Sequence, residues 1–257
     1  MQKGMPVVLG LSGALLAGLA VGTADATLIH HYEFNSGGTF LEDSVGTRDL
    51  SIVDGDGTTG GPPTFVSSVT ATNGTRTGVV RLAGNGATNS PNKYLLNNDG
   101  AFTLPNFTVA YWVRTDTSNQ GGFKGIFASG PSGEMQFDNN NGVYRGITDA
   151  GTVNFANVVP VDQWDHIALT YDGTTTRWYY NGGEVGSNVG NPDNSFQQIR
   201  LGINRNIDNA FEGDLDDVRI YSSALDANAI AALAVIPEPS SLALLGLGGL
   251  LMARRRR

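Results

Sequence analysis

Residues 163–185, QWDHIALTYDGTTTRWYYNGGEV, have the clearest pattern of short strands and turns in the chain. Residues 164–171 form a strand candidate in which Ile167, Leu169 and Tyr171 occupy every second position and so share one face. Asp172 and Gly173 begin a turn, residues 176–180 return, and a second turn of asparagine and glycines follows. Short strands joined by tight turns predict an antiparallel meander.

Strand patterns continue on both sides of this meander. The strongest is FTVAYWVR, residues 107–114, in which β-branched and aromatic side chains occupy both faces, as in a strand inside a sandwich. Residues 28–34, 198–203 and 214–221 are further candidates. Residues 54–92 are rich in Gly, Thr, Asn and Pro, and we expect long loops there. The pattern predicts an all-β fold.

Only one short helix is expected in the body of the chain. No amphipathic helical pattern precedes Ser223, and Asp226 can cap a helix over residues 227–234. We expect Ile230 and Leu233 to share the face that packs on the sandwich.

Composition restricts the possible functions. The 257 residues are 40% apolar and 16% charged, with 35 glycines and no cysteine, so disulfides and thiolate sites are excluded. The net charge is −8, and it becomes more negative if the two ends are removed. An acidic body repels phosphate backbones, so we expect no nucleic-acid partner.

The first 26 residues are predicted to be a signal peptide. Lys3 precedes an apolar run, and Ala24-Asp25-Ala26 has the small-x-small pattern of a cleavage site. A buried N-terminal helix is the alternative interpretation. Export without disulfides requires the core, with or without a metal ion, to stabilise the fold.

The last 23 residues form a second targeting pattern. Residues 242–253 are apolar or glycine, about 18 Å as a helix, which is short for a bilayer core of about 30 Å. The run ends in four basic residues that favour the cytoplasmic side: Arg254, Arg255, Arg256 and Arg257. A hydrophobic helix at each terminus, the C-terminal one a short transmembrane anchor, is therefore expected. A permanent anchor is the alternative.

This tail resembles the PEP-CTERM sorting signal. Pro237, Glu238 and Pro239, the apolar run and the arginines occur in the order of that family over residues 235–257. The resemblance implies export in a Gram-negative bacterium and a transient inner-membrane anchor. It also implies removal of the tail by an exosortase-type membrane protease.

Residues 27–234 resemble the laminin-G-like, concanavalin A-like domains. The matching pieces, in family order, are HYEF with DSVG, then FTVAYWVR, QWDHIALTYDGTTTRWYYNGGEV and FEGDLDDVRIYSSALDANAIAAL. The resemblance implies a two-sheet antiparallel jelly-roll sandwich.

Glycoside hydrolases share that fold, so we looked for their acids. Two carboxylates must face each other across a cleft, and the E-x-D-x-x-E and E-x-D-x-E patterns are absent. Glu134 and Asp138 are four residues apart, but their surroundings resemble loops. His30, His31 and His166 suit structural roles better than catalysis. We predict no enzyme.

Consecutive aromatic residues offer a binding surface. Trp178, Tyr179 and Tyr180 cannot all face one core, and an exposed ring can stack on a sugar. We predict that Trp178 and Tyr180 contact the ligand. The alternative is that these rings cover the second face of the sandwich.

A structural calcium site is a further prediction. In the resembling domains the terminal strands lie close together, so Asp43 and Asp216 become candidate carboxylate ligands, with loop carbonyls completing the shell. Asp216 shares parity with Val218 and Ile220, which predicts that it points inward. The alternative is that Asp43 caps a turn and Asp216 accepts backbone N–H groups. Calcium should raise the melting temperature if the site exists.

These patterns together predict an exported, non-catalytic binding module of the cell surface or exopolysaccharide matrix. Its ligand is expected to be an extracellular polysaccharide or a matrix glycoprotein. The alternatives are a glycan hydrolase or lyase on the same fold and a structural biofilm-matrix protein.

Overall fold

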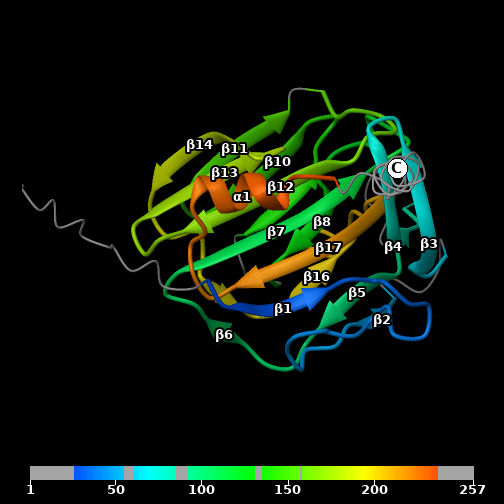
Figure 1. Ribbon diagram of the computed structural model, residues 1–257, viewed down its shortest axis with the longest axis horizontal. Coiled ribbons are helices and arrows are strands. Elements are labelled where there is room, and N and C mark those ends of the chain that lie inside the picture. Colours follow the sequence, from blue (N-terminus) through cyan, green and yellow to red (C-terminus); the bar gives the residue numbers. More distant parts are fainter. Residues whose placement is uncertain (1–25, 55–60, 85–91, 131–134, 157, 237–257) are drawn as a thin grey trace, which may run out of the picture.

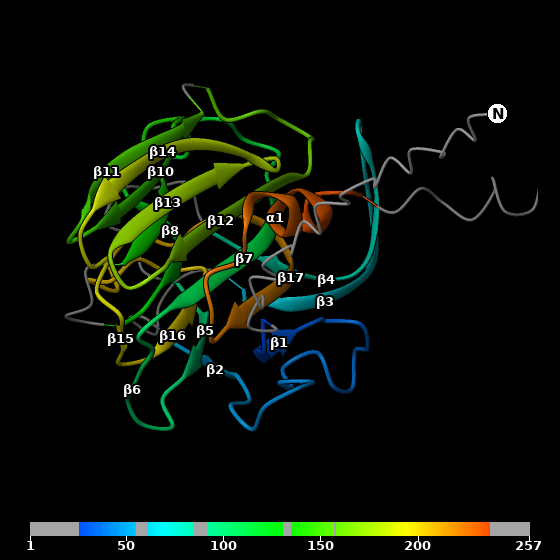
Figure 2. The same ribbon diagram turned by 60° about the vertical axis from the view of Figure 1, so that its left-hand side comes forward.

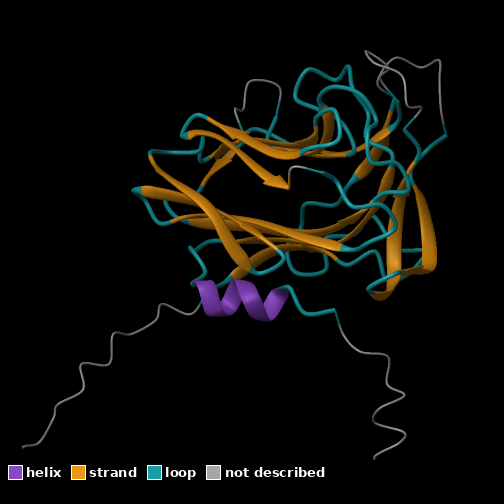
Figure 3. Ribbon diagram, turned by 90° about the horizontal axis from the view of Figure 1, so that it is seen from above, coloured by secondary structure: helices purple, strands orange, loops and turns teal. Residues whose placement is uncertain are grey.

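The protein folds into two antiparallel sheets packed face to face, with one short helix on the outside (Figure 1). The computed structural model describes residues 26–54, 61–84, 92–130, 135–156 and 158–236. Figure 3 shows the sheets as two layers, with the helix α1 against the outer surface of one of them. The predicted two-sheet sandwich is confirmed.

The eight-stranded sheet contains the predicted meander. In this sheet, β1 (Leu28–Tyr32) pairs with the second half of β17 (Gly213–Tyr221). β4 (Gly74–Leu82) pairs with the start of β17. Its other strands, in order across the sheet, are β14 (Gly183–Val189), β13 (Thr175–Tyr180), β12 (Asp165–Tyr171), β7 (Phe107–Arg114), β17 (Gly213–Tyr221), β4 (Gly74–Leu82) and β3 (Thr64–Ala71).

The seven-stranded sheet forms the second layer. Its order is β11 (Gly151–Ala156), β10 (Tyr144–Thr148), β9 (Gln136–Asn139), β8 (Lys124–Ala128), β16 (Ile199–Leu201), β5 (Tyr94–Asn97) and β2 (Ser51–Val53). A separate short pair joins β6 (Phe102–Thr103) to β15 (Ser195–Phe196).

The main core lies between the sheets and follows the strand period. In β7, Phe107, Val109, Tyr111 and Val113 face the other sheet and are at most 1% exposed. Ala110 and Trp112 belong to separate clusters on the outer face. Alternating apolar residues on both faces explain why this strand lies at the centre of its sheet.

The helix α1 (Ala227–Leu233) covers part of that outer face. The Asp226 carboxylate accepts a hydrogen bond of 2.8 Å from the Ala229 N–H, which confirms the predicted cap. Ile230 is fully buried against Ala110, Ala168 and Tyr179.

The prediction of long loops over residues 54–92 is wrong for most of the described part. β3 and β4 form a long hairpin there, at one edge of the sheet (Figure 2). Threonine and valine dominate its strands and favour extended backbone, so the glycines and asparagine mark a tight turn instead of a long loop. Residues 55–60 and 85–91 lie outside the described residues.

The predicted terminal helices also lie outside the described residues, which begin at residue 26 and end at residue 236. Within the described ranges, no helix is long and apolar enough to cross a membrane.

Candidate functional site

The three consecutive aromatic residues of β13 face inward or are covered. Trp178 is fully buried between the sheets, where a side chain at Gly146 would collide with its indole nitrogen. Tyr179 faces the other way but lies beneath α1. The prediction that Trp178 contacts a ligand is therefore wrong, because a buried ring cannot stack on a sugar. The ring of Trp178 instead packs in the main core between the sheets.

Tyr180 is partly buried and packs against the main core. Its hydroxyl donates a 2.7 Å hydrogen bond to the Asp165 carboxylate, which also accepts from the side chain of Asn181. The contact of Tyr180 with a ligand stays a prediction.

Asp43 organises the turn after β1. Its Oδ1 accepts backbone N–H bonds from His31 and Gly46, and its Oδ2 accepts one from Arg48 and lies 2.7 Å from Nδ1 of His30. Burial alone would raise the pKa of this carboxyl, but these hydrogen bonds outweigh it and hold the pKa well below its usual range. Asp43 thus has the turn-capping contacts named as the alternative to calcium.

Asp216 points the opposite way from the prediction. A bulge between Asp216 and Arg219 breaks the strand parity, so Val218 and Ile220 face the core while Asp216 pairs with Trp112 on the outer face. There its carboxylate accepts a 2.5 Å bond from Nε of Arg76. The inward orientation predicted from parity is wrong because the bulge inserts one residue.

Across the described ranges, no group of three His, Asp or Glu side chains is arranged to hold a metal ion. The calcium prediction, with Asp43 and Asp216 as ligands, rests on the family resemblance and stays a prediction.

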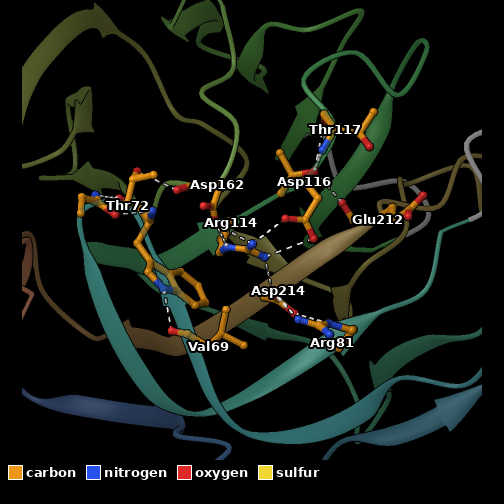
Figure 4. Close-up of polar contacts among 12 residues, drawn as sticks. Val69, Thr72, Arg81, Arg114, Asp116, Thr117, Asp162, Glu212 and Asp214 are labelled. Atoms are coloured by element: carbon orange, nitrogen blue, oxygen red, sulfur yellow. Dashed lines mark hydrogen bonds and ion pairs between the residues drawn. The ribbon is translucent and has the colours of Figure 1, made fainter.

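The other buried carboxylates are held by basic or amide groups. The guanidinium of Arg114 contacts Asp116, Asp162 and Asp214, and Arg81 binds the same Asp214 from the other side (Figure 4). This cluster joins the end of β7 to β17 and to the loop before β12. Such ion pairs fix structure and hold their carboxylates in place. Glu134, one half of the acid pair considered above, lies outside the described residues.

An exposed aromatic ring and a polar cluster meet on the outer face of the seven-stranded sheet. Phe123 immediately precedes β8 and is 50% exposed, and the Arg145 guanidinium carbon lies 4.9 Å from its ring centroid. Arg145 donates two bonds, of 3.1 and 2.8 Å, to the buried carboxylate of Asp138. Gln136 donates to the same carboxylate at 2.6 Å. We call Phe123, Gln136, Asp138 and Arg145 the Phe123 platform.

Strand alternation places the platform on the outer face. Phe137 and Tyr144 point into the main core, so their neighbours Asp138 and Arg145 point away from it. Burial raises the pKa of the Asp138 carboxyl, although Arg145 and Gln136 oppose this by favouring the charged form.

The loop that carries Phe123 is fixed to the β9–β10 turn. The Phe123 N–H donates to the Asn140 side chain at 3.2 Å, and the Asn141 N–H donates to the Gly121 carbonyl at 2.9 Å. Phe123 and Asn141 both adopt left-handed backbone, with φ of 59° and 54°. Backbone in this region is held only by surrounding contacts, so the ring is presented in a fixed place.

The platform has the chemistry of a sugar-binding surface. An exposed aromatic face attracts the apolar C–H face of a pyranose or furanose ring, and amides and guanidinium N–H groups bond its hydroxyls. Asn119 and Asn141 are exposed, and both bond Gly121 in the loop that carries Phe123. Sequence reasoning missed this surface because GGFKGIF is an unremarkable strand start, and Arg145 lies 22 residues further along the chain.

A family profile matches more than half of the chain. It covers residues 85–231 and is described as the concanavalin A-like lectin/glucanases superfamily. The chain belongs to this superfamily. A second profile, the PEP-CTERM protein-sorting motif, matches residues 235–257 and marks the chain for export and surface sorting.

Solved lectin-like structures resemble this superfamily member in fold. Domain 4 of the extracellular arabinanase AbnA from Geobacillus stearothermophilus, solved with arabinotriose, has a TM-score of 0.60 and 23% identity, over 82% of this chain and 99% of that one. The botulinum neurotoxin serotype D ligand-binding domain, solved with N-acetylneuraminic acid, has a TM-score of 0.55 and 18% identity. That match covers 80% of this chain and 50% of the toxin chain. No curated protein matches the chain.

Proposed function

We propose that the protein is an exported, non-catalytic glycan-binding module of a Gram-negative cell surface or exopolysaccharide matrix. The observation that carries the proposal is the Phe123 platform, an exposed aromatic ring that stacks on the guanidinium of Arg145, which the buried Asp138 carboxylate holds in place. Two proteins of similar fold, the arabinanase domain and the neurotoxin domain, were solved with a neutral and an acidic sugar respectively, which supports a glycan ligand here without fixing its charge.

The sorting motif supports a surface location. In this proposal a signal peptide over residues 1–26 directs export, and the tail anchors the chain transiently in the inner membrane. An exosortase-type protease then removes the tail, and the module meets extracellular polysaccharide or matrix glycoprotein. The rival function of a glycan hydrolase or lyase requires two carboxylates across an open groove. In the described ranges, buried Asp138, Asp214 and Asp216 are instead bonded to arginines.

Affinity electrophoresis of Phe123 variants through gels containing exopolysaccharide tests the proposal. Phe123→Ala should weaken the affinity measured by retardation by a factor of about two to ten, because stacking with an aromatic ring contributes about 0.5–1.5 kcal/mol and about 1.4 kcal/mol is a factor of ten. Phe123→Tyr should keep the affinity. Val189→Ala is the control, since Val189 is also an exposed apolar residue, 82% exposed, but lies in β14. Equal retardation of wild type and Phe123→Ala would remove the platform from the proposal.

A further inference from the structure

The charge of the domain restricts which glycan it can bind. Residues 27–236 contain 11 of the 16 basic residues of the chain and 22 of its 24 acidic residues. The domain therefore carries a net charge of −11, which repels a polyanion at long range.

Six of the nine arginines of the domain are paired with neighbouring carboxylates, whereas Arg48 donates to the neutral oxygens of Asn97 and Gly100. Six ion pairs each join an arginine to an aspartate: Arg76–Asp216, Arg81–Asp214, Arg114–Asp162, Arg145–Asp138, Arg177–Asp172 and Arg219–Asp217. Lys93 pairs with Asp54 at 3.5 Å, and Arg200 is buried against neutral oxygens of Gln198 and Arg205.

The Phe123 platform shows the same neutralisation at short range. Nε and one terminal nitrogen of Arg145 donate to the Asp138 carboxylate, which is fully buried. A uronate, sulfate or phosphate group could reach only the N–H groups of Arg145 that do not bond Asp138, and the buried Asp138 carboxylate already offsets the charge that would attract it. Sugar hydroxyls need no such charge, because the ring of Phe123 and the side chains of Asn119 and Asn141 are exposed.

We infer that the glycan is neutral, composed of uncharged sugar units without uronate, sulfate or phosphate substituents. This inference rests on the proposed function and specifies its ligand class. Binding should then depend on stacking and hydroxyl hydrogen bonds, which are short-ranged and only weakly screened by salt.

The test uses host exopolysaccharide separated by anion exchange into a neutral and an acidic fraction. The exported protein should bind the neutral fraction, with a Kd that changes less than about twofold between about 50 and about 500 mM sodium chloride, although the Debye length falls about threefold. Binding confined to the acidic fraction, weakening steeply with salt, would overturn the inference while leaving glycan binding intact. Binding to neither fraction would instead contradict the proposed function.

A charge-matched pair of variants gives an independent measurement. Asp138→Asn and Asp172→Asn each remove one negative charge and release one arginine, but only the first arginine, Arg145, belongs to the platform. We expect Asp138→Asn alone to gain retention on the acidic fraction. An equal gain for Asp172→Asn would show that net charge, and not the platform, selects the ligand. Because Asp138 is buried, its substitution can disturb folding, so circular dichroism checks that Asp138→Asn is folded. The salt dependence of wild-type binding tests the inference independently of this variant.

Discussion

A single left-handed residue, Asp217, gathers charged groups from three strands. Its φ is 57°, and its carboxylate lies 2.6 Å from Nε2 of His31 in β1, 2.8 Å from Arg219 in β17 and 3.3 Å from Arg76 in β4. Aspartate tolerates this backbone region better than most residues because its short polar side chain bonds locally. The bulge that it forms also turns Asp216 to the outer face, so one residue determines two sets of contacts.

His166 lies beside this cluster and should make stability depend on pH. Burial lowers the pKa of the imidazole to about 3, with Asp217, Arg76 and Arg219 as the nearby charges, and the ring makes an edge contact with Trp112. Between about pH 6.5 and about pH 3 the unfolded chain gains a proton at His166 that the folded chain does not. Stability should therefore fall as the pH falls through that window, by about 1.4 kcal/mol per pH unit.

Urea denaturation between pH 7.5 and pH 4.5 measures this slope, and His166→Phe, which keeps a ring against Trp112 without a titrating group, should flatten it. The difference in slope between the two proteins isolates His166 from every titratable group that the two proteins share. Identical slopes would show that His166 is protonated in the folded state.

At the scale of elements, the strands that could be predicted are those with strong alternation. β7, β12 and β13 contain β-branched and aromatic residues in extended runs, and the faces of β7 and β12 are as expected, whereas Trp178 of β13 points into the core. The short strands β8, β9 and β10 escaped prediction. Glycine, asparagine and charged residues interrupt them, and they are held by pairing with partners distant in sequence.

The helix α1 should be required for stability although it is only 7 residues long. Ile230→Ala should destabilise the domain by about 2–4 kcal/mol, because it leaves a cavity over Ala110, Ala168 and Tyr179. Asn228→Ala is the control on the exposed side of the same helix and should change stability by less than about 0.5 kcal/mol. Thermal or urea unfolding of both variants measures the difference. A loss below about 1 kcal/mol for Ile230→Ala would mean that α1 detaches readily from the sheet.

At the scale of the whole molecule, the sandwich was predictable and the candidate site was not. The order of motifs along the chain carries the topology, since the motifs overlap, in order, β1, β7, β12 to β14, and β17 with α1. The Phe123 platform depends on register: Arg145 reaches Phe123 only because β8 pairs with β9 and β9 with β10. Trp178 could not be placed from the sequence because a packed second sheet buries it, and the inward orientation predicted for Asp216 was wrong because a bulge turns it to the outer face.

The position of Ile236 leads to a prediction about processing. This residue packs on Val69, Val79, Trp112 and Trp164, and a Cβ at Gly74 would lie 2.8 Å from its side chain, so the folded domain extends to residue 236. The motif Pro237-Glu238-Pro239 follows at once. Cleavage there would remove none of the described packing, so the exported protein should remain folded.

We therefore expect the exported protein to lack residues 1–26 and the tail beyond the cleavage point near Pro237-Glu238-Pro239, and its mass to be lower by the mass of these residues. A purified chain that ends at Ile236 should melt at the temperature of the exported protein. Ile236→Ala in that chain should lower stability by about 1 kcal/mol, since the side chain is only partly buried. Mass spectrometry and thermal melting make these measurements. An exported protein that still carries Arg254–Arg257 would contradict removal of the tail, and an unchanged melting temperature for Ile236→Ala would show that the domain ends before residue 236.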